Sequence, residues 1–241
     1  MTEKLTVSIL AAGMGTRLGK PHPKCLTVLD NGENIMERQL RLIKTAFGKD
    51  FKTTIVVGFQ AERIVEMFPN ETYIYNPDYD ITNTSKSLLK VLNGKPSGGV
   101  LWLNGDVVFD EDLMIYISNK ISQGDNFVTV NSNNIGDEEV KYTLDPLGNI
   151  DALSKIVPLS DALGEAVGVN YVNSSTTQSF KHALTKVKNQ DYFEKAIELS
   201  IMKDNSNWVP FDITKLGLSA VEVDFGADLV TANKHFFTQK L

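Results

Sequence analysis

The sequence predicts an α/β fold of three layers, α/β/α, with a mostly parallel central sheet and a small antiparallel β insertion. In the first half of the chain, short apolar runs alternate with segments of helical spacing, and this β-α-β-α order is typical of a parallel sheet with helices on both faces. After about residue 125 the apolar runs are joined by turns such as Asp145-Pro146-Leu147-Gly148, which favours antiparallel pairing. We therefore expect a single domain over residues 1–241 with an insertion at about 125–175.

Each element expected in the first half has a local reason. The apolar runs at 5–10, 52–57 and 100–103 predict buried strands, with a shorter strand at 72–75. A helix is expected at 34–47 because apolar side chains recur there at helical spacing, at Met36, Leu40, Ile43 and Phe47. Further helices are expected at 60–68, 83–92 and 110–121, the first ended by Pro69 and the second by a glycine-containing loop.

The second half is predicted as short strands followed by helices. The strands are expected at 127–131, 140–144, 149–153 and 166–172. Two amphipathic helices follow, and their apolar faces carry Phe180, Ala183, Leu184 and Val187 in one, and Phe193, Ala196, Ile197 and Ile201 in the other. A short strand at 221–223 and a helix at 225–236 complete the chain.

Composition excludes several classes of protein. The apolar fraction of 42% and the charged fraction of 22% are ordinary for a globular protein, and the net charge of −6 argues against a nucleic-acid partner. The single cysteine, Cys25, cannot form a disulfide within the chain, which favours a cytoplasmic location, and its apolar neighbours predict a buried thiol. The first apolar run is too short for a signal peptide or a membrane span, so no membrane insertion is expected. A homodimer stays open.

The first strand leads into a glycine-rich basic loop that extends to Lys24. It resembles two common phosphate motifs but matches neither, because Leu18 replaces the third glycine of G-x-G-x-x-G and Pro21 replaces the hydroxyl of a P-loop. A tight turn with incidental charge is the simple alternative. The coincidence of small residues and cations favours phosphate binding, with Arg17 as a bidentate clamp and Lys24 as a point charge, while Lys20 and His22 are expected to be solvated flanks.

Four motifs resemble those of the sugar-phosphate and alcohol-phosphate nucleotidyltransferases. They are Leu10-Ala11-Ala12-Gly13-x-Gly15-Thr16-Arg17-Leu18 with Pro23-Lys24, Leu103-Asn104-Gly105-Asp106, Glu222-x-Asp224-x-x-x-Asp228-Leu229-x-x-Ala232, and Asn76-Pro77-x-Tyr79 with Asn83 and Ser87-Leu88. The last is similar to the branch typified by bacterial phosphocholine cytidylyltransferases. The resemblance implies the Rossmann-like fold of nucleotide-diphospho-sugar transferases and the transfer of CMP from CTP to a small phosphorylated alcohol, amine or phosphonate, with release of pyrophosphate.

The resemblance also implies site residues. Asp106 and Asp224 would hold Mg²⁺, although the first could instead close a turn and the second could cap the last helix. Arg17 and Lys24 would be catalytic. Nucleotide contacts would come from Leu10, Ala11, Ala12, Gly13, Gly15, Thr16, Arg17, Asn83, Ser87 and Asp106, and acceptor contacts from Lys24, Tyr79, Lys155 and Glu165. Asn83 could equally cap the following helix, and this chain has Asn83-Thr84 where the family often has two asparagines.

Two other functions remain open. The first is a uridylyl- or thymidylyltransferase that acts on a sugar 1-phosphate, and the second is a non-catalytic nucleotide-binding module. A choline acceptor would call for an aromatic cage, for which the candidates are Tyr79, Tyr142, Tyr171 and Trp208, the third of these being more typical of a core position.

Overall fold

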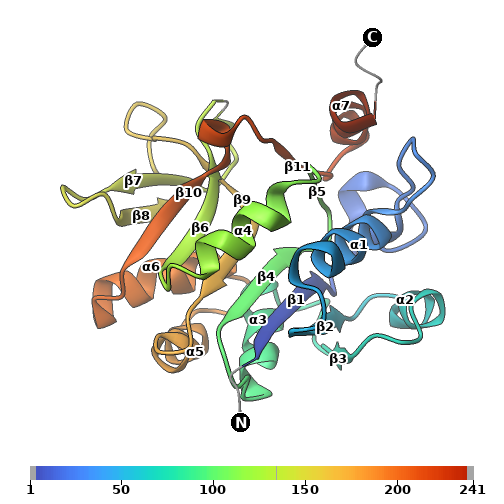
Figure 1. Ribbon diagram of the computed structural model, residues 1–241, viewed down its shortest axis with the longest axis horizontal. Helices are drawn as coiled ribbons and strands as arrows, with labels where there is room; N and C mark the ends of the chain where they lie inside the picture. Colours follow the sequence, from blue (N-terminus) through green and yellow to red (C-terminus); the bar gives the residue numbers. More distant parts are fainter. Residues whose placement is uncertain (1–3, 134, 238–241) are drawn as a thin grey trace.

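A twisted sheet of nine strands forms the centre of the computed structural model, which describes residues 4–133 and 135–237. Its main path runs β10-β6-β9-β4-β1-β2-β3 (Figure 1). The bounds of these strands are Leu5–Ala11 for β1, Phe51–Val57 for β2, Tyr73–Tyr75 for β3, Val100–Asn104 for β4, Asn126–Asn131 for β6, Glu165–Val172 for β9 and Trp208–Asp212 for β10. Strands β3, β2, β1 and β4 are parallel, whereas β9 lies antiparallel between β4 and β6.

The predicted insertion is divided between two places. Strands β6 and β9 extend the central sheet, and β10 adds to β6 in parallel. The hairpin of β7 (Lys141–Leu144) and β8 (Ile150–Ser154) lies beside them and is joined through the pairing of Lys141 with Glu165. A second, two-stranded sheet pairs β5 (Val107–Phe109) with β11 (Ala220–Glu222). The predicted class, a mostly parallel sheet with a small antiparallel part, is confirmed.

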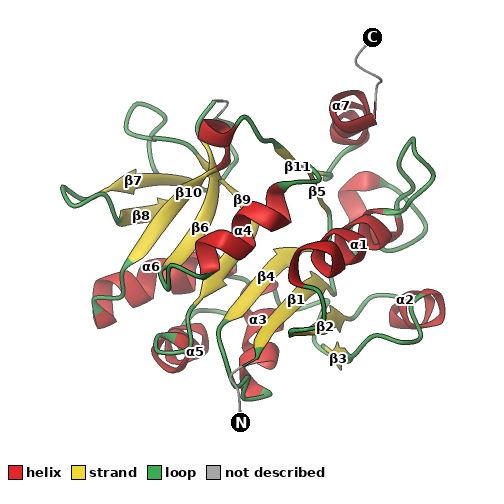
Figure 2. Cartoon of the chain, in the orientation of Figure 1, coloured by secondary structure: helices red, strands yellow, loops and turns green. Residues whose placement is uncertain are grey.

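Helices cover both faces of the sheet, as Figure 2 shows. Helices α1 (Ile35–Phe47) and α4 (Leu113–Ile121) pack on one face, and α3 (Thr84–Asn93), α5 (Thr177–Lys186) and α6 (Phe193–Asp204) pack on the other. Helix α2 (Ala61–Met67) precedes β3, and α7 (Gly226–Phe237) ends the described chain. Short 3₁₀ turns lie at Thr16–Leu18, Lys24–Leu26 and Ile213–Leu216.

Caps fix the ends of two helices that matter for the site. The Asn34 side chain accepts a hydrogen bond from Glu37 N and the Glu37 carboxylate accepts one from Asn34 N, so α1 begins with a capping box. Asn83 caps α3 by accepting from Thr84 N at 2.8 Å. This confirms the capping alternative for Asn83.

The acidic residues before α4 differ from the prediction. The helix begins at Leu113 rather than at 110, because the acids serve tertiary contacts instead of the first helical turn. Asp110 accepts from Ser219 N at 2.7 Å, and Glu111 pairs with Arg38 and Arg41. Both contacts join segments far apart in sequence, so local periodicity could not reveal them.

The core lies in two layers, one on each face of the sheet. On the α3–α5–α6 face, Trp102 of β4 contacts the rings of Phe180, Phe193 and Trp208, with centroids 5.5–6.3 Å apart. Such ring pairs add about 0.5–1.5 kcal/mol each beyond the area they bury. Cys25 lies in the opposite layer, 2% exposed, and burial raises the pKa of its thiol, as the sequence predicted for an inert cysteine. Among the described residues no helix has both the length and the apolar character to cross a membrane.

Candidate active site

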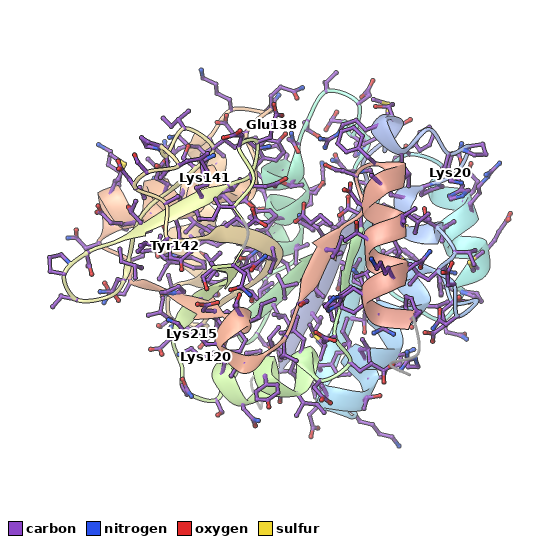
Figure 3. All side chains as sticks on the ribbon, turned by 90° about the horizontal axis from the view of Figure 1, so that it is seen from above. Lys20, Lys120, Glu138, Lys141, Tyr142 and Lys215 are labelled. Atoms are coloured by element: carbon purple, nitrogen blue, oxygen red, sulfur yellow. The ribbon has the colours of Figure 1, made fainter. Side chains whose placement is uncertain are left out.

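A cleft of about 1260 Å³ opens at the carboxyl ends of the parallel strands β1 and β4. One wall is the glycine-rich loop that follows β1. The opposite wall comes from the segment before β7, the start of β9 and the start of α6. In Figure 3, Glu138 of this opposite wall and Lys141 lie on the β7 side, and Lys20 lies on the other side of the molecule. Lys20 and His22 do not line the cleft, as expected for flanking residues.

Two cations and two carboxylates converge in this cleft. The Lys24 ammonium contacts Asp106 Oδ2 at 3.1 Å and also contacts Asp224 Oδ1. Arg17 pairs with the other oxygen of Asp224 at 2.7 Å. Burial alone would lower the pKa of Lys24, but the charges and hydrogen bonds of Asp106 and Asp224 outweigh that effect and raise the pKa, so this side chain is cationic at neutral pH.

Glycines allow this convergence. Gly15 has a left-handed φ of +60°, and a Cβ built there would lie 2.5 Å from Lys24 Cγ. Only glycine leaves room for the lysine stem at that position. Gly105 lies against the end of β1, where its N–H donates to Leu10 O at 2.9 Å, and a Cβ would lie 3.0 Å from that oxygen. The two loops can therefore approach closely at the ends of their strands.

The pairing of β5 with β11 brings Asp224 to Asp106 across a long stretch of sequence. Glu222 is in register with Val107, and Val223 N donates to Asp106 O at 2.9 Å. Gln39, buried on α1, donates to Asn104 O at 2.9 Å and to Val107 O at 2.8 Å, so it fixes the turn on both sides of Asp106. Sequence reasoning missed Gln39, because its helix position indicates only burial.

The donor set fits Mg²⁺. Two carboxylate oxygens, one from Asp106 and one from Asp224, are aimed at a single ammonium, so they point to one position where a cation is held. Mg²⁺ usually takes one or two protein carboxylates and completes its shell with water and substrate phosphates. No cluster of three or more candidate ligands occurs among the described residues, and with phosphate present no third ligand is needed.

The residues predicted to bind the nucleotide are mostly brought together. Leu10, Ala11, Gly13, Gly15, Thr16, Arg17, Asn83 and Asp106 line the cleft. Ala12 and Ser87 do not: Ala12 O accepts from Phe59 N, and Ser87 is buried and accepts from Asn76 at 3.3 Å. The Asn83 amide is also engaged, because it caps α3 and donates to Gln190 O at 3.3 Å.

The acceptor candidates Tyr79, Lys155 and Glu165 all line the cleft. Tyr79 lies on the side of the glycine-rich loop, because Gly58 is close to both Tyr79 Cβ and Ala12 O. The Lys155 ammonium lies 5.1 Å from the centre of the Tyr192 ring, and Glu165 accepts from Gly136 N at 2.8 Å. Burial raises the pKa of Glu165, with a further rise from the charge of Glu139.

The four aromatic residues considered for a choline cage do not come together. Of the four, only Tyr79 lines the cleft, because Tyr142, Tyr171 and Trp208 are buried in the core by 94% or more. Tyr171 stacks on Phe127 with centroids 5.5 Å apart, which confirms the core position expected for it.

Besides Glu165, four glutamates that the sequence did not single out for the acceptor line the cleft, namely Glu138, Glu139, Glu194 and Glu222. Glu222 accepts from Asn104 at 3.3 Å, and burial raises its pKa, followed by the charges of Asp106 and Glu194. Glu194 is 7% exposed and burial raises its pKa to about 7. Its place in the first turn of α6 is ordinary for an acid beside a helix dipole, so no sequence signal distinguished it.

The fold gathers these charged groups at the carboxyl ends of parallel strands, which is where open α/β sheets bind their ligands. The family model described as MobA-like NTP transferase domain matches residues 7–169, and the chain belongs to this family of nucleotidyltransferases. A curated relative, the bifunctional protein GlmU of Synechococcus sp. (strain CC9902), is 35% identical over 107 residues. That match covers 43% of this chain and 23% of the relative, so the chain spans about a quarter of the relative's length.

Solved structures share the whole fold at low sequence identity. The CTP:phosphocholine cytidylyltransferase of Streptococcus pneumoniae has a TM-score of 0.74 and 18% identity, over 96% of this chain and 98% of the other. A UDP-glucose pyrophosphorylase in complex with UDP-glucose has a TM-score of 0.76 and 12% identity, over 96% and 97% of the two chains. The predicted nucleotide-diphospho-sugar transferase fold is thereby confirmed.

Proposed function

We propose that this chain is a Mg²⁺-dependent cytidylyltransferase that moves CMP from CTP to a small phosphorylated alcohol, amine or phosphonate and releases pyrophosphate. The observation that carries the proposal is the convergence of Arg17 and Lys24 on Asp106 and Asp224 beside the glycine-rich loop. Cations alone would hold a triphosphate, but the paired carboxylates add a place for a divalent ion.

The reaction joins two anions. A phosphate oxygen of the acceptor attacks the α-phosphorus of CTP, a new P–O bond forms, and the bond from the α-phosphorus to its bridging oxygen breaks with its electrons leaving on pyrophosphate. The attacking oxygen is already anionic at neutral pH, since the second pKa of a phosphate monoester is about 6. No general base is required, which agrees with a cleft in which His235, on the last helix, is the one lining histidine among the residues that the structure describes.

The charged residues of the chain supply positioning and neutralisation. Arg17, with a side chain 55% exposed, is free to reorient from Asp224 to phosphate oxygens, which it can clamp with two parallel hydrogen bonds. Lys24 pairs with the two aspartates in this structure. When Asp106 and Asp224 hold Mg²⁺, which neutralises charge on the reacting phosphates, the Lys24 ammonium would turn to phosphate oxygens beside the metal. The segment at about 125–175, with Lys155 and Glu165, would bind the acceptor.

CTP is favoured over other nucleotides by the segment from Asn76 to Leu88, which resembles the cytidylyltransferase branch, and by the likeness to a phosphocholine cytidylyltransferase. A second candidate is a uridylyl- or thymidylyltransferase acting on a sugar 1-phosphate. The likeness to UDP-glucose pyrophosphorylase supports it, and the Asn83 amide that would read cytosine is engaged in other hydrogen bonds.

A pyrophosphate-release screen tests the proposal. Each of CTP, UTP, ATP and dTTP is incubated with Mg²⁺ and one acceptor from a panel of phosphoethanolamine, phosphocholine, 2-aminoethylphosphonate, glycerol 3-phosphate and glucose 1-phosphate. We expect release with CTP and a non-sugar acceptor. Release with UTP or dTTP and glucose 1-phosphate alone would establish the second candidate instead. The inactive control is Asp106→Asn, and the matched surface control is Asp50→Asn, far outside the cleft lining.

A further inference from the structure

The acceptor end of the cleft is rich in carboxylates. Glu139, Glu165, Glu194 and Glu222, which we call the glutamate cluster, all line it. The basic side chains near them are Lys141 and Lys155. Lys141 is buried with its ammonium donating to Asp137 O and Glu139 O, and it does not line the cleft. At this end of the cleft, carboxyl groups therefore outnumber basic side chains.

Glu194 differs from the other three members because one of its carboxyl oxygens, Oε2, is buried without a hydrogen-bond donor. The residue is 7% exposed, and in the described part of the chain no hydrogen bond reaches this oxygen. By contrast, Glu165 accepts from Gly136 N and Glu222 accepts from Asn104. A buried carboxylate oxygen without a donor is costly, so its presence in a ligand cleft points to a donor that arrives with the ligand.

The segment that holds Glu194 is firmly fixed. Phe193 N donates to Thr84 Oγ1 at 3.3 Å, and Ser85 Oγ donates to Asp191 O at 2.6 Å. Both bonds tie the start of α6 to the start of α3, next to the segment proposed to hold the base. The position of Glu194 relative to the nucleotide side of the cleft is thus set by the fold, as a specificity-determining group requires.

The glutamate cluster extends away from the place where the acceptor phosphate would react. Glu222 lies within electrostatic reach of Asp106 on one side and of Glu194 on the other. An acceptor whose phosphate lies near Asp106 and Lys24 would extend past Glu222 toward Glu194. Its far end would meet carboxylates, and a positive charge is the complement of that environment.

We propose that the acceptor carries a protonated amine with N–H donors, and that Glu194 accepts a hydrogen bond from it. This inference rests on the proposed nucleotidyl transfer and narrows its acceptor class. A quaternary ammonium has no N–H to satisfy Oε2 and is usually held by an aromatic cage. That cage is missing here, since three of its candidates are core residues and the Tyr192 face already has the Lys155 ammonium over it.

Calorimetry with three acceptors of equal phosphate chemistry tests the inference. The probes are phosphoethanolamine, phosphocholine and glycerol 3-phosphate, titrated into the protein with Mg²⁺ and a CTP analogue whose α,β-bridging oxygen is a methylene, so that no turnover occurs. We expect phosphoethanolamine to bind about ten- to a hundred-fold more tightly than the other two, the range of one hydrogen bond to a charged group. Glu194→Gln should remove this preference, and Glu194→Asp should retain part of it. The control is Glu198→Gln, one turn further along α6, where Glu198 pairs with Lys195 and does not line the cleft.

Four results would overturn the inference. They are equal binding of phosphoethanolamine and glycerol 3-phosphate, tighter binding of phosphocholine, an unchanged preference in a folded Glu194→Gln variant, and no binding of any of the three probes. Failure of the proposed function looks different. Phosphoethanolamine binding that depends on Glu194, without pyrophosphate release from any nucleotide, would keep the amine site and refute the transfer. Transfer to glucose 1-phosphate alone would keep a transferase and refute the amine site.

Discussion

The buried carboxyl of Glu194 makes folding stability depend on pH in a calculable way. Its pKa is raised from 4.5 to about 7, first by burial and then by the charge of Glu139, while Lys155 acts in the opposite direction. Because the folded pKa lies above the unfolded one, the folded protein binds the proton more tightly, and stability falls as pH rises from about 4.5 to about 7. Between about pH 5.5 and pH 8.5 the expected loss is about 2 kcal/mol, from roughly 1.5 pKa units at 1.36 kcal/mol each.

Glu194→Gln isolates this contribution. The variant cannot ionise at this position, so it does not lose this free energy of unfolding as the pH rises. The difference in free energy of unfolding, variant minus wild type, should therefore be about 2 kcal/mol larger at pH 8.5 than at pH 5.5. For a chain of this size, that corresponds to a relative rise in Tm of about 4–8 °C. Any cost of placing an amide beside its neighbours is present at both pH values and cancels. The assay is thermal or urea unfolding of wild type, Glu194→Gln and the control Glu198→Gln. A constant difference between wild type and Glu194→Gln across this range would show that the pKa of Glu194 is not raised in the folded protein.

Three further predictions concern the catalytic end of the cleft. Gly15→Ala should lose most activity because its Cβ displaces Lys24. Gly19→Ala, at a φ of +67° with open space around it, should lower the free energy of unfolding by about 1–2 kcal/mol, as Gly15→Ala does, but keep activity. Comparable catalytic rates for both variants would contradict this. Arg17→Lys should lower kcat/KM by about ten- to a hundred-fold through loss of the bidentate clamp, with an unchanged Tm; a wild-type rate would show that Arg17 does not contact phosphate. Removal of Mg²⁺ with EDTA should abolish turnover. With Mn²⁺ as a probe for the metal site, Asp224→Asn should weaken metal binding about ten-fold or more, as measured by electron paramagnetic resonance. Undiminished Mn²⁺ binding would exclude Asp224 as a ligand.

Much of the fold could be predicted because its signals are local. Apolar runs and helical spacing predicted β1, β2, β4 and α1 within one or two residues of their observed ends. The elements missed were β5 and β10, whose reasons are long-range. Val107–Phe109 is a strand because it pairs with Ala220–Glu222, and Trp208–Asp212 is a strand because it pairs with β6. No window of sequence contains both partners.

The candidate site divides in the same way. Gly13, Gly15, Arg17, Lys24 and Asp106 could be predicted because the motifs that carry them have a fixed spacing, and all of them line the cleft. Glu194 could not be predicted, because its significance depends on burial and on the absence of a donor to Oε2 in the described structure. Ser87 shows the converse, since its spacing suggested a base contact but its side chain is turned inward to Asn76.

Nucleotidyl transfer in this cleft is tested by identifying the products with ³¹P NMR after incubation with CTP, Mg²⁺ and phosphoethanolamine. We expect two mutually coupled diphosphate resonances of the CDP-linked product and an equal amount of pyrophosphate, with neither formed by Asp106→Asn. Orthophosphate and free CDP in place of these products, or their formation by Asp106→Asn at the wild-type rate, would contradict the assignment of nucleotidyl transfer to this cleft.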